Sequence, residues 1–298
     1  MNWDDIRIFL AIAREGQILA AARGLGVNHA TVARRLSALE DAMGARLFVR
    51  RTNGCDLTAE GEALLERAES MESAALNAQS AIGGTDASIS GAVRVGAPDG
   101  FGVGFLAQRL GTLRARHPAL TIQLVPVPRS FSLSRREADI AITVARPTEG
   151  RLVYRKLVDY RLGLYASLDY VKQYGQPSTL ADLNEHSLVG HVEDLIFTPS
   201  LDYAGDIWKG WRSDIEVSSA LGQTEAVRGG GGIGILHDFL ARQHTELIPV
   251  LPDTGLDRSY WMVMHEDVRA IKRVSVVADF IAETVTSARG NFVRSEPA

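Results

Sequence analysis

The pattern of apolar and polar positions between residues 18 and 51 predicts two short helices joined by a tight turn, then an element that ends in basic residues. The alanines at positions 20–22 are small, so a second helix can pack closely against them. Leu25-Gly26-Val27 places a flexible glycine between two apolar anchors. Asn28 is a suitable N-cap for the next helix, because its side-chain oxygen can accept an amide N–H left free at a helix start.

The second of these helices is predicted to have one buried face and one polar, basic face. Val32, Leu36 and Leu39 recur at helical spacing and form the inner face. A helix-turn-helix with a basic outer face suits the major groove of DNA. An ordinary helical hairpin with a solvated basic face has the same pattern and stays open as an alternative. The candidate DNA-binding residues on the outer face and in the basic element that follows are Asn28, His29, Thr31, Arg34, Arg35, Arg50 and Arg51.

Residues 58–82 are predicted to form one long helix. Thr58 can cap its start, and acidic residues follow in the first turn. Small and apolar residues then recur at alternating three- and four-residue steps, which is a heptad pattern. We expect this stripe to pack against a second chain, although packing against its own domain is the alternative. The predicted contacts of this dimerisation seam are Leu64, Ala68, Met71, Ala75 and Ile82.

Residues 83–90 are rich in small residues and read as a linker. After them the pattern changes to strands alternating with helices, which predicts parallel sheets covered by helices. The expected strands are 92–96, 120–127, 140–142, 162–166 and 260–265, and the expected helices include 105–116 and 268–283. Further elements of this part are expected at 169–174, 180–183, 187–189, 223–229, 234–236 and 238–242.

The N-terminal segment resembles the DNA-binding domain of LysR-type transcriptional regulators. The residues that carry the resemblance are Phe9, Ala13, Ala21, Ala22, Leu25, Gly26, Val27, Arg34, Leu36, Leu39, Glu40, Gly44, Leu47, Phe48, Arg50, Leu57, Thr58 and Gly61. Gln17 stands where the family usually has Ser, which removes a good N-cap. His29 stands where the family usually has Gln, so the operator sequence of relatives does not transfer to this chain.

The remainder of the chain is similar to the effector-binding domain of the same family. The matching segments are 91–96, 136–142, 146–147, 181–183, 226–227, 230–234 and 279–280. The resemblance implies two α/β lobes joined by two crossing strands, as in periplasmic sugar- and amino-acid-binding proteins, with a ligand between the lobes. It also implies that the long helix pairs two chains.

The predicted fold is therefore α plus α/β in three parts. A winged helix-turn-helix covers residues 1–58, and a linker and dimerisation helix with a hinge covers 59–88. A two-lobed α/β effector-binding domain of the periplasmic-binding-protein type covers residues 89–298. In it, lobe I comprises 89–161 and 267–298, and lobe II comprises 162–266.

Length and composition agree with this organisation. A chain of 298 residues is expected to form two or three domains. Its net charge of −4 does not oppose DNA binding, because binding depends on the electrostatic field near the contact surface. Residues 28–51 contain five arginines and only two acidic residues, Glu40 and Asp41. No apolar run could span a bilayer and the N-terminus is unlike a signal peptide, so we expect a cytoplasmic protein. The single cysteine, Cys55, excludes an internal disulfide and a multi-cysteine metal site.

The sequence contains no catalytic pattern, and we expect no enzyme, no metal site and no cofactor. The chain lacks the zinc-protease, nucleophile-elbow and P-loop motifs, and its seven histidines are scattered. Gly229, Gly231 and Gly234 match a dinucleotide-binding spacing. However, they follow a predicted helix and precede a predicted strand, which reverses the order that a phosphate site needs. We interpret them as a helix C-terminus followed by a tight turn.

A ligand cleft is predicted where strands end, because ligands of open α/β sheets bind outside the C-terminal ends of strands. Helices starting near Gly100 and Thr224 would direct free N–H groups towards an anion. Arg129 or Arg146 could bind a carboxylate, unless they are solvated or structural. Asp99, where the family often has Ser or Thr, favours an effector that also carries a donor group. The candidate effector-binding residues are Pro98, Asp99, Gly100, Phe101, Arg129, Ser130, Arg146, Gln223 and Thr224.

Taken together, these features predict a LysR-type regulator that binds a double-stranded DNA operator as a homodimer or homotetramer and responds to a small-molecule effector, with no membrane partner. Two alternatives stay open. One is a DNA-binding regulator without an effector, its cleft filled by side chains. The other is an enzyme or a small-molecule-binding protein that reuses the two-lobed fold.

Overall fold

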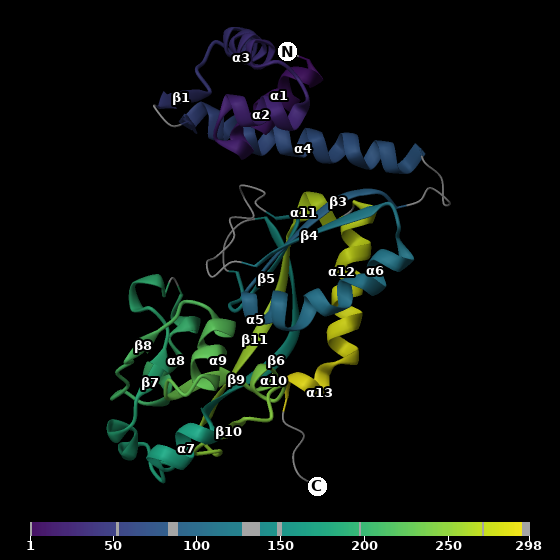
Figure 1. Ribbon diagram of the computed structural model, residues 1–298. Coiled ribbons are helices and arrows are strands. Elements are labelled where there is room, and N and C mark those ends of the chain that lie inside the picture. Colours follow the sequence, from purple (N-terminus) through teal and green to yellow (C-terminus); the bar gives the residue numbers. More distant parts are fainter. Residues whose placement is uncertain are drawn as a thin grey trace. The chain divides into compact units, whose positions relative to one another are not determined.

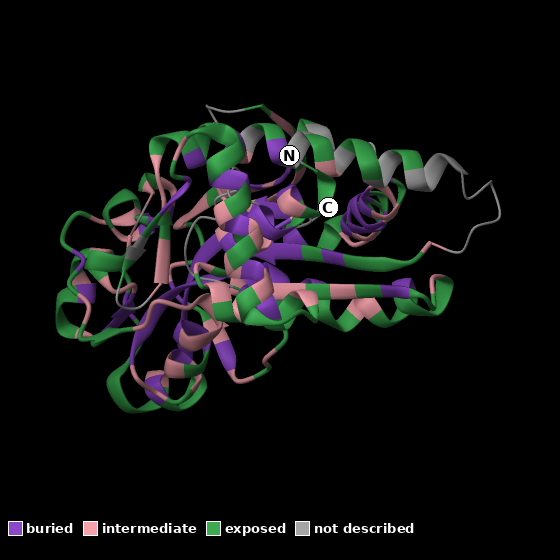
Figure 2. Cartoon of the chain, turned by 90° about the horizontal axis from the view of Figure 1, so that it is seen from above, coloured by how far each residue is buried: buried purple, intermediate pink, exposed green. Residues whose placement is uncertain are grey.

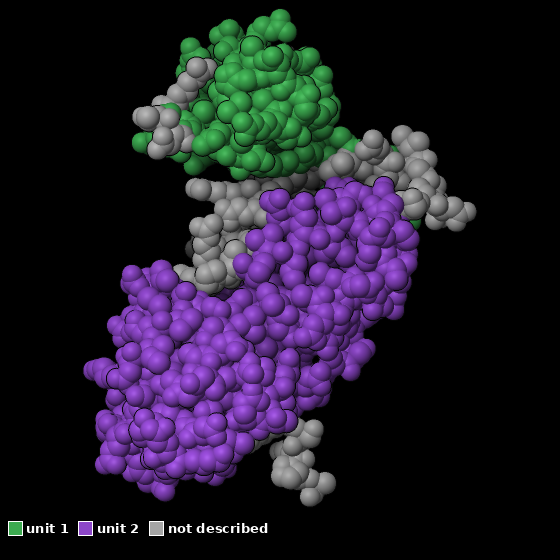
Figure 3. All heavy atoms as spheres, viewed as in Figure 1, with its two compact units in different colours: residues 1–87, 132–137, 267–272 green, residues 88–131, 138–266, 273–298 purple. Residues whose placement is uncertain are grey.

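The computed structural model describes residues 2–51, 54–82, 89–126, 138–147, 151–196, 198–269 and 271–293. The chain forms two compact units, which Figure 3 shows in different colours. Unit 1 comprises residues 1–87, 132–137 and 267–272, and unit 2 comprises residues 88–131, 138–266 and 273–298. The predicted linker helix therefore belongs to the same compact unit as the predicted DNA-binding segment.

Unit 1 is built on three short helices, a two-stranded hairpin and one long helix (Figure 1). Their bounds are α1 (Trp3–Glu15), α2 (Ile18–Leu25), α3 (His29–Met43), β1 (Phe48–Arg51), β2 (Gly54–Leu57) and α4 (Ala59–Ile82). The first three helices each end at a glycine with positive φ, namely Gly16, Gly26 and Gly44. A residue with a side chain is disfavoured in that conformation, so these glycines set the helix lengths.

The core of unit 1 confirms the predicted inner face of α3. Val32, Leu36 and Leu39 are buried and pack in one cluster with Phe9 and the alanines of α2. The Phe9 ring also lies 5.4 Å from the Phe48 ring of β1, centroid to centroid, so the hairpin is joined to the helical core. Helix spacing and small residues thus identified this core from the sequence.

Helix α4 begins as predicted, but part of its stripe of small and apolar residues packs within unit 1. The Thr58 hydroxyl accepts the Gly61 N–H at 3.0 Å, which confirms the cap. Leu64 and Ala68 are buried in the core of unit 1, so their predicted role in dimerisation is corrected: their own domain already covers them. Met71 is exposed. Ala75 is exposed as well, whereas the side chain of Ile82 lies outside the described part.

In unit 2 nine strands form one mixed sheet in the order β4-β3-β5-β11-β6-β9-β7-β8, with β10 paired to β6. Their bounds are β3 (Gly91–Ala97), β4 (Leu120–Pro126), β5 (Ile140–Thr143), β6 (Leu152–Ser167), β7 (Leu188–Gly190), β8 (Ile215–Glu216), β9 (Ile233–His237), β10 (Leu247–Pro249) and β11 (Gly255–His265). Buried residues concentrate in strands such as β5, β7 and β9, whereas both residues of β8 are exposed; Figure 2 shows the burial along the chain.

The two long strands β6 and β11 run through both halves of this sheet. They pair antiparallel from Gly255 opposite Gly163 to His265 opposite Leu152. Strand β5 pairs with one end of β11, and β9 pairs with the other end of β6, so the halves correspond to lobes I and II. These are the two crossing strands that the family resemblance implies. The sequence patterns predicted only their apolar ends and missed residues 152–161, where exposed and half-buried positions dominate.

The helices after α4 alternate with the strands of this sheet along the chain (Figure 1). They are α5 (Asp99–Phe101), the π-helical Gly102–Leu106, the 3-10 segment Ala107–Arg109, α6 (Leu110–Arg116), α7 (Leu168–Tyr174), α8 (Tyr203–Ile207), α9 (Ala220–Arg228), α10 (Asp238–Ala241), α11 (Glu266–Arg269), α12 (Lys272–Ser287) and α13 (Arg289–Phe292). Short 3-10 helices span Ala181–Glu185, Glu193–Leu195 and Pro199–Leu201. Within the described ranges, no helix is long and apolar enough to cross a membrane.

Candidate functional site

The outer face of α3 is available to a ligand much as predicted. His29 and Arg34 are exposed and Thr31 is half-buried. Asn28 is also exposed, but its side-chain oxygen accepts the Ala30 N–H at 2.8 Å and caps the helix. Asn28 therefore orients α3, while His29, Thr31 and Arg34 project outward from it.

Arg35 forms an ion pair that the sequence did not predict. Its guanidinium lies 3.3 Å from the Asp4 carboxylate and 3.7 Å from the Asp5 carboxylate, both in the first turn of α1. Two carboxylates thus balance its charge within the protein. The ion pair joins α3 to α1, and the DNA contact of Arg35 stays a prediction.

The hairpin of β1 and β2 has the form of a wing. Arg51 forms an ion pair with Asp56, and both side chains are exposed. The backbone of Arg50 pairs with Cys55, and the Arg50 side chain lies outside the described part of the structure. The Cys55 N–H donates to the Gly16 carbonyl at 2.7 Å, so this half-buried cysteine belongs to the contact between the hairpin and α1.

Glu40 is a positioning residue that the functional predictions missed. It is buried near the end of α3, where one carboxylate oxygen accepts the Leu47 N–H at 2.8 Å and the Phe48 N–H at 3.4 Å. The other oxygen accepts from the Arg46 guanidinium at 2.7 Å. A buried carboxylate needs such partners, and here they set the position of β1 relative to α3. A signal existed in the sequence, since an acidic residue directly follows the apolar positions of α3.

In the predicted cleft, Asp99 makes a polar contact between the lobes. Asp99 opens α5 directly after β3 of lobe I. Its carboxylate accepts the Ser219 hydroxyl at 2.7 Å, the Leu221 N–H at 3.0 Å and the Ala220 N–H at 3.3 Å, all at the start of α9 in lobe II. The predicted preference of Asp99 for a donor group is satisfied by the protein itself.

The residues beside Asp99 are less available than predicted. Gly100 is buried, and Phe101 is fully buried with its ring centroid 4.9 Å from that of Tyr260. We therefore correct their predicted effector contacts to packing roles, because a Cβ atom at Gly100 would meet Ala220 and Leu240, and Phe101 lies in an aromatic cluster. Pro98 is half-buried.

Behind Asp99, this aromatic cluster also holds a histidine of lobe II. The His237 ring stacks on Tyr160 at 5.1 Å between centroids. Burial lowers the pKa of His237 to about 4, so the ring is neutral near pH 7. His237 therefore has a packing role in this cluster.

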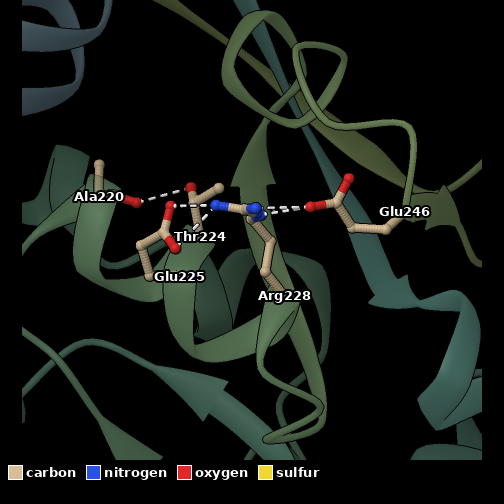
Figure 4. A network of polar contacts seen from close by, with 5 residues as sticks. All are labelled: Ala220, Thr224, Glu225, Arg228 and Glu246. Atoms are coloured by element: carbon tan, nitrogen blue, oxygen red, sulfur yellow. Dashed lines mark hydrogen bonds and ion pairs between the residues drawn. The ribbon is translucent and has the colours of Figure 1, made fainter.

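On lobe II, α9 begins at Ala220 and not near Thr224 as predicted. The Thr224 hydroxyl is buried and donates to the Ala220 carbonyl at 2.8 Å, so its predicted effector contact is wrong (Figure 4). The other end of the helix is fixed by Arg228, which donates to Glu225 at 2.7 Å and to Glu246 at 2.7 Å (Figure 4). Both ends of α9 are thereby anchored by polar contacts.

Gln223 stays a candidate because it lines a cavity. Its side-chain N–H donates to the Val217 carbonyl at 2.7 Å. The cavity has a volume of about 170 Å³ and lies in lobe II, with Tyr203, Trp208 and Trp211 among its walls. The aromatic lining suits a small ligand with an apolar face.

Arg146 does not join this group. Arg146 is exposed and its guanidinium carbon lies 4.5 Å above the Tyr154 ring centroid, so its partner is an aromatic residue of lobe I. Arg129 and Ser130 lie outside the described residues.

The glycine-rich turn has the reversed context that the sequence predicted. Helix α9 ends at Arg228 and β9 starts at Ile233. The positive φ values fall at Gly230 (80°) and Gly232 (140°), so the helix ends in a turn and not in a phosphate site. Within the described residues, no group of three or more His, Cys, Asp or Glu side chains could hold a metal ion.

Comparison with known proteins relates both units to one family. Residues 3–62 match the family described as bacterial regulatory helix-turn-helix protein, lysR family. Residues 86–286 match the LysR substrate binding domain. A probable HTH-type transcriptional regulator LtrA of Klebsiella pneumoniae is 27% identical over 99% of this chain and 97% of its own length.

Two further similarities differ in extent. An HTH-type transcriptional regulator of Xanthomonas campestris is 31% identical, but the match spans 61% of this chain and 53% of that protein. A full-length OxyR variant from Pseudomonas aeruginosa has a TM-score of 0.72 at 18% identity, over 95% of this chain and 98% of that one. At this identity the likeness concerns the fold.

Proposed function

The chain belongs to the LysR family of transcriptional regulators, and we propose that it reads its DNA operator in the cytoplasm through His29, Thr31 and Arg34 of α3. The observation that carries this proposal is the outward face of a capped α3 whose inner face is buried. Arg34 can donate two hydrogen bonds to a guanine edge, and His29 and Thr31 add polar contacts. Because its curated relatives are transcriptional regulators, we propose a regulatory and not a catalytic role.

Replacing Arg34 by alanine is expected to weaken operator binding and relax specificity at one base position, by about 1–3 kcal/mol. Arg51→Ala in the wing should weaken binding to all sequences alike, since phosphate contacts carry no direct base information. Binding to a panel of single-base operator variants distinguishes the two patterns. Arg114→Ala removes the same charge from exposed α6 and serves as the control. A uniform loss with Arg34→Ala would contradict the base-reading role.

We infer that α4 pairs two chains through the exposed part of its stripe, which includes Met71 and Ala75. Leu64 and Ala68 then support the seam from within unit 1. Arg14 of α1 holds α4 with two hydrogen bonds to Glu72, at 2.6 and 3.2 Å. These hydrogen bonds fix α4 next to Met71. The assembly that we propose is a homodimer or a homotetramer.

Met71→Asp is expected to shift the assembly towards single chains, because it places an unpaired charge in the seam, at a cost of several kcal/mol. Sedimentation velocity of the full chain measures the shift. Ala63→Asp adds the same charge at an exposed position of α4 outside the heptad stripe, and its sedimentation should match the wild type. An unchanged oligomer in Met71→Asp would refute this seam.

We propose further that a small-molecule effector binds between lobes I and II. The supporting observations are the two crossing strands, the contact between Asp99 and α9, and the neighbouring cavity of lobe II lined by Gln223. The crossing strands allow the lobes to change their relative angle on ligand binding. Such a change can alter how the DNA-binding units of an oligomer are spaced.

A further inference from the structure

The start of α9 has no free donor in its first turn. Asp99 accepts the Ala220 and Leu221 N–H groups, and the Ser219 hydroxyl oxygen accepts the Gly222 N–H at 3.0 Å. The fourth N–H, of Gln223, donates to the Ser219 carbonyl at 2.8 Å. The Ser219 hydroxyl in turn donates to Asp99. Every group that would bind an anion at this helix start already has a partner from the protein.

The occupant of this position comes from the other lobe. Asp99 and Ser219 are 120 residues apart in sequence, and they belong to lobe I and lobe II respectively. A carboxylate at a helix N-terminus is favoured by the helix dipole, and its hydrogen bonds are stronger than neutral ones. The contact therefore holds one lobe against the other without a bound ligand.

Close packing surrounds this contact. A Cβ atom at Gly100 would lie 3.2 Å from the Ala220 Cβ and 3.3 Å from the Leu240 Cδ1. A Cβ atom at Gly104 would lie 2.4 Å from the Leu240 Cδ2. The two glycines thus let the helical segment of lobe I approach α9 and α10 of lobe II. The contact between Asp99 and α9 is therefore part of a closely packed junction of the two lobes.

We propose that Asp99 is a built-in anion that fills the place a ligand carboxylate would take at the N-terminus of α9. It determines specificity, because an anionic group of a ligand must displace Asp99 to reach these donors. It also keeps the two lobes together in the absence of an effector. This inference rests on the proposed function only in treating the space between the lobes as the effector site.

The test uses formate as a probe and full-length Asp99→Ala, which leaves the donors of Ser219, Ala220 and Leu221 without their acceptor. The variant should unfold at a temperature lower by roughly 3–10 °C, since charge-assisted hydrogen bonds are lost. Added sodium formate should raise its unfolding temperature in a saturable way, against sodium chloride at equal ionic strength. The wild type should show no difference between the two salts.

Asp182→Ala is the matched control, because Asp182 also accepts two backbone N–H groups, from Ser178 at 2.8 Å and Thr179 at 2.9 Å, but within lobe II alone. Formate should not rescue it. If the alanine variant folds poorly, Asp99→Ser serves as the second variant, because it keeps a polar side chain. Formate should raise its unfolding temperature in the same way.

Absence of rescue in both Asp99 variants, or equal rescue in the wild type or Asp182→Ala, would overturn the proposal. Operator affinity of the wild type is measured separately. Rescue by formate without operator binding would support this inference and contradict the proposed function. Operator binding without rescue would support the proposed function and contradict this inference.

Discussion

Glu40→Ala is expected to destabilise unit 1 by about 3 kcal/mol and to abolish tight operator binding. The substitution leaves two amides, of Leu47 and Phe48, without the carboxylate that now accepts them at 2.8 and 3.4 Å. Each buried donor left unsatisfied costs about 1–3 kcal/mol. Because these amides begin the wing, its position relative to α3 should be lost first.

Hydrogen exchange of unit 1 peptides in the full chain measures this effect separately from unit 2. Asp41→Ala is the matched control, because it removes the same charge from the next position of α3, where the side chain is exposed. Its effect should stay within about 0.5 kcal/mol. Equal protection of residues 44–51 in Glu40→Ala and the wild type would show that Glu40 does not position the wing.

The stabilisation by Glu40 should also depend on pH. Burial alone would raise the pKa of Glu40, but hydrogen bonds from the Leu47 amide, Arg46 and the Phe48 amide lower it below the ordinary value. The unfolded chain therefore takes up this proton at a higher pH than the folded chain. The contribution is complete above the ordinary glutamate pKa and is lost as the pH falls through the lowered one. The stability difference between the wild type and Glu40→Gln should accordingly narrow on acidification.

Gly61→Ala is expected to destabilise unit 1 by roughly 3 kcal/mol, although alanine normally favours a helix. A Cβ atom at this position would lie 2.2 Å from the Leu47 carbonyl oxygen and 3.0 Å from the Leu57 Cδ2. The Leu47 backbone cannot retreat, because its N–H is bound by Glu40 and its carbonyl accepts the Thr58 N–H at 3.0 Å. The start of α4 must then move away from β1.

Gly24→Ala provides the control for this prediction. Gly24 lies inside α2, and a Cβ atom there would meet nothing within 4 Å. Alanine should therefore stabilise unit 1 by about 0.5–1 kcal/mol. Hydrogen exchange of unit 1 should rise for Gly61→Ala and fall for Gly24→Ala. The same direction of change in both variants would show that the clash with Leu47 is relieved at little cost.

The sequence alone determined those features that depend on neighbours a few residues away. The buried face of α3 and its cap at Asn28 follow from helical spacing and from local backbone chemistry. The same holds for the Thr58 cap and the reversed glycine motif. The crossing strands were expected from family resemblance, since the mixed polar pattern of residues 152–161 contains no strand signal of its own.

Only the tertiary structure decided which side chains remain available to a ligand. Arg35 and Asp99 are charged and looked equally free in the sequence, but each meets partners far along the chain, at Asp4 and at Ser219. Phe101 is likewise buried in an aromatic cluster. The local sequence pattern predicts the helix or strand on which a residue lies. The hydrogen-bond partner of its side chain depends on which elements the fold brings together. The roles of these residues therefore depend on long-range contacts that no local spacing encodes.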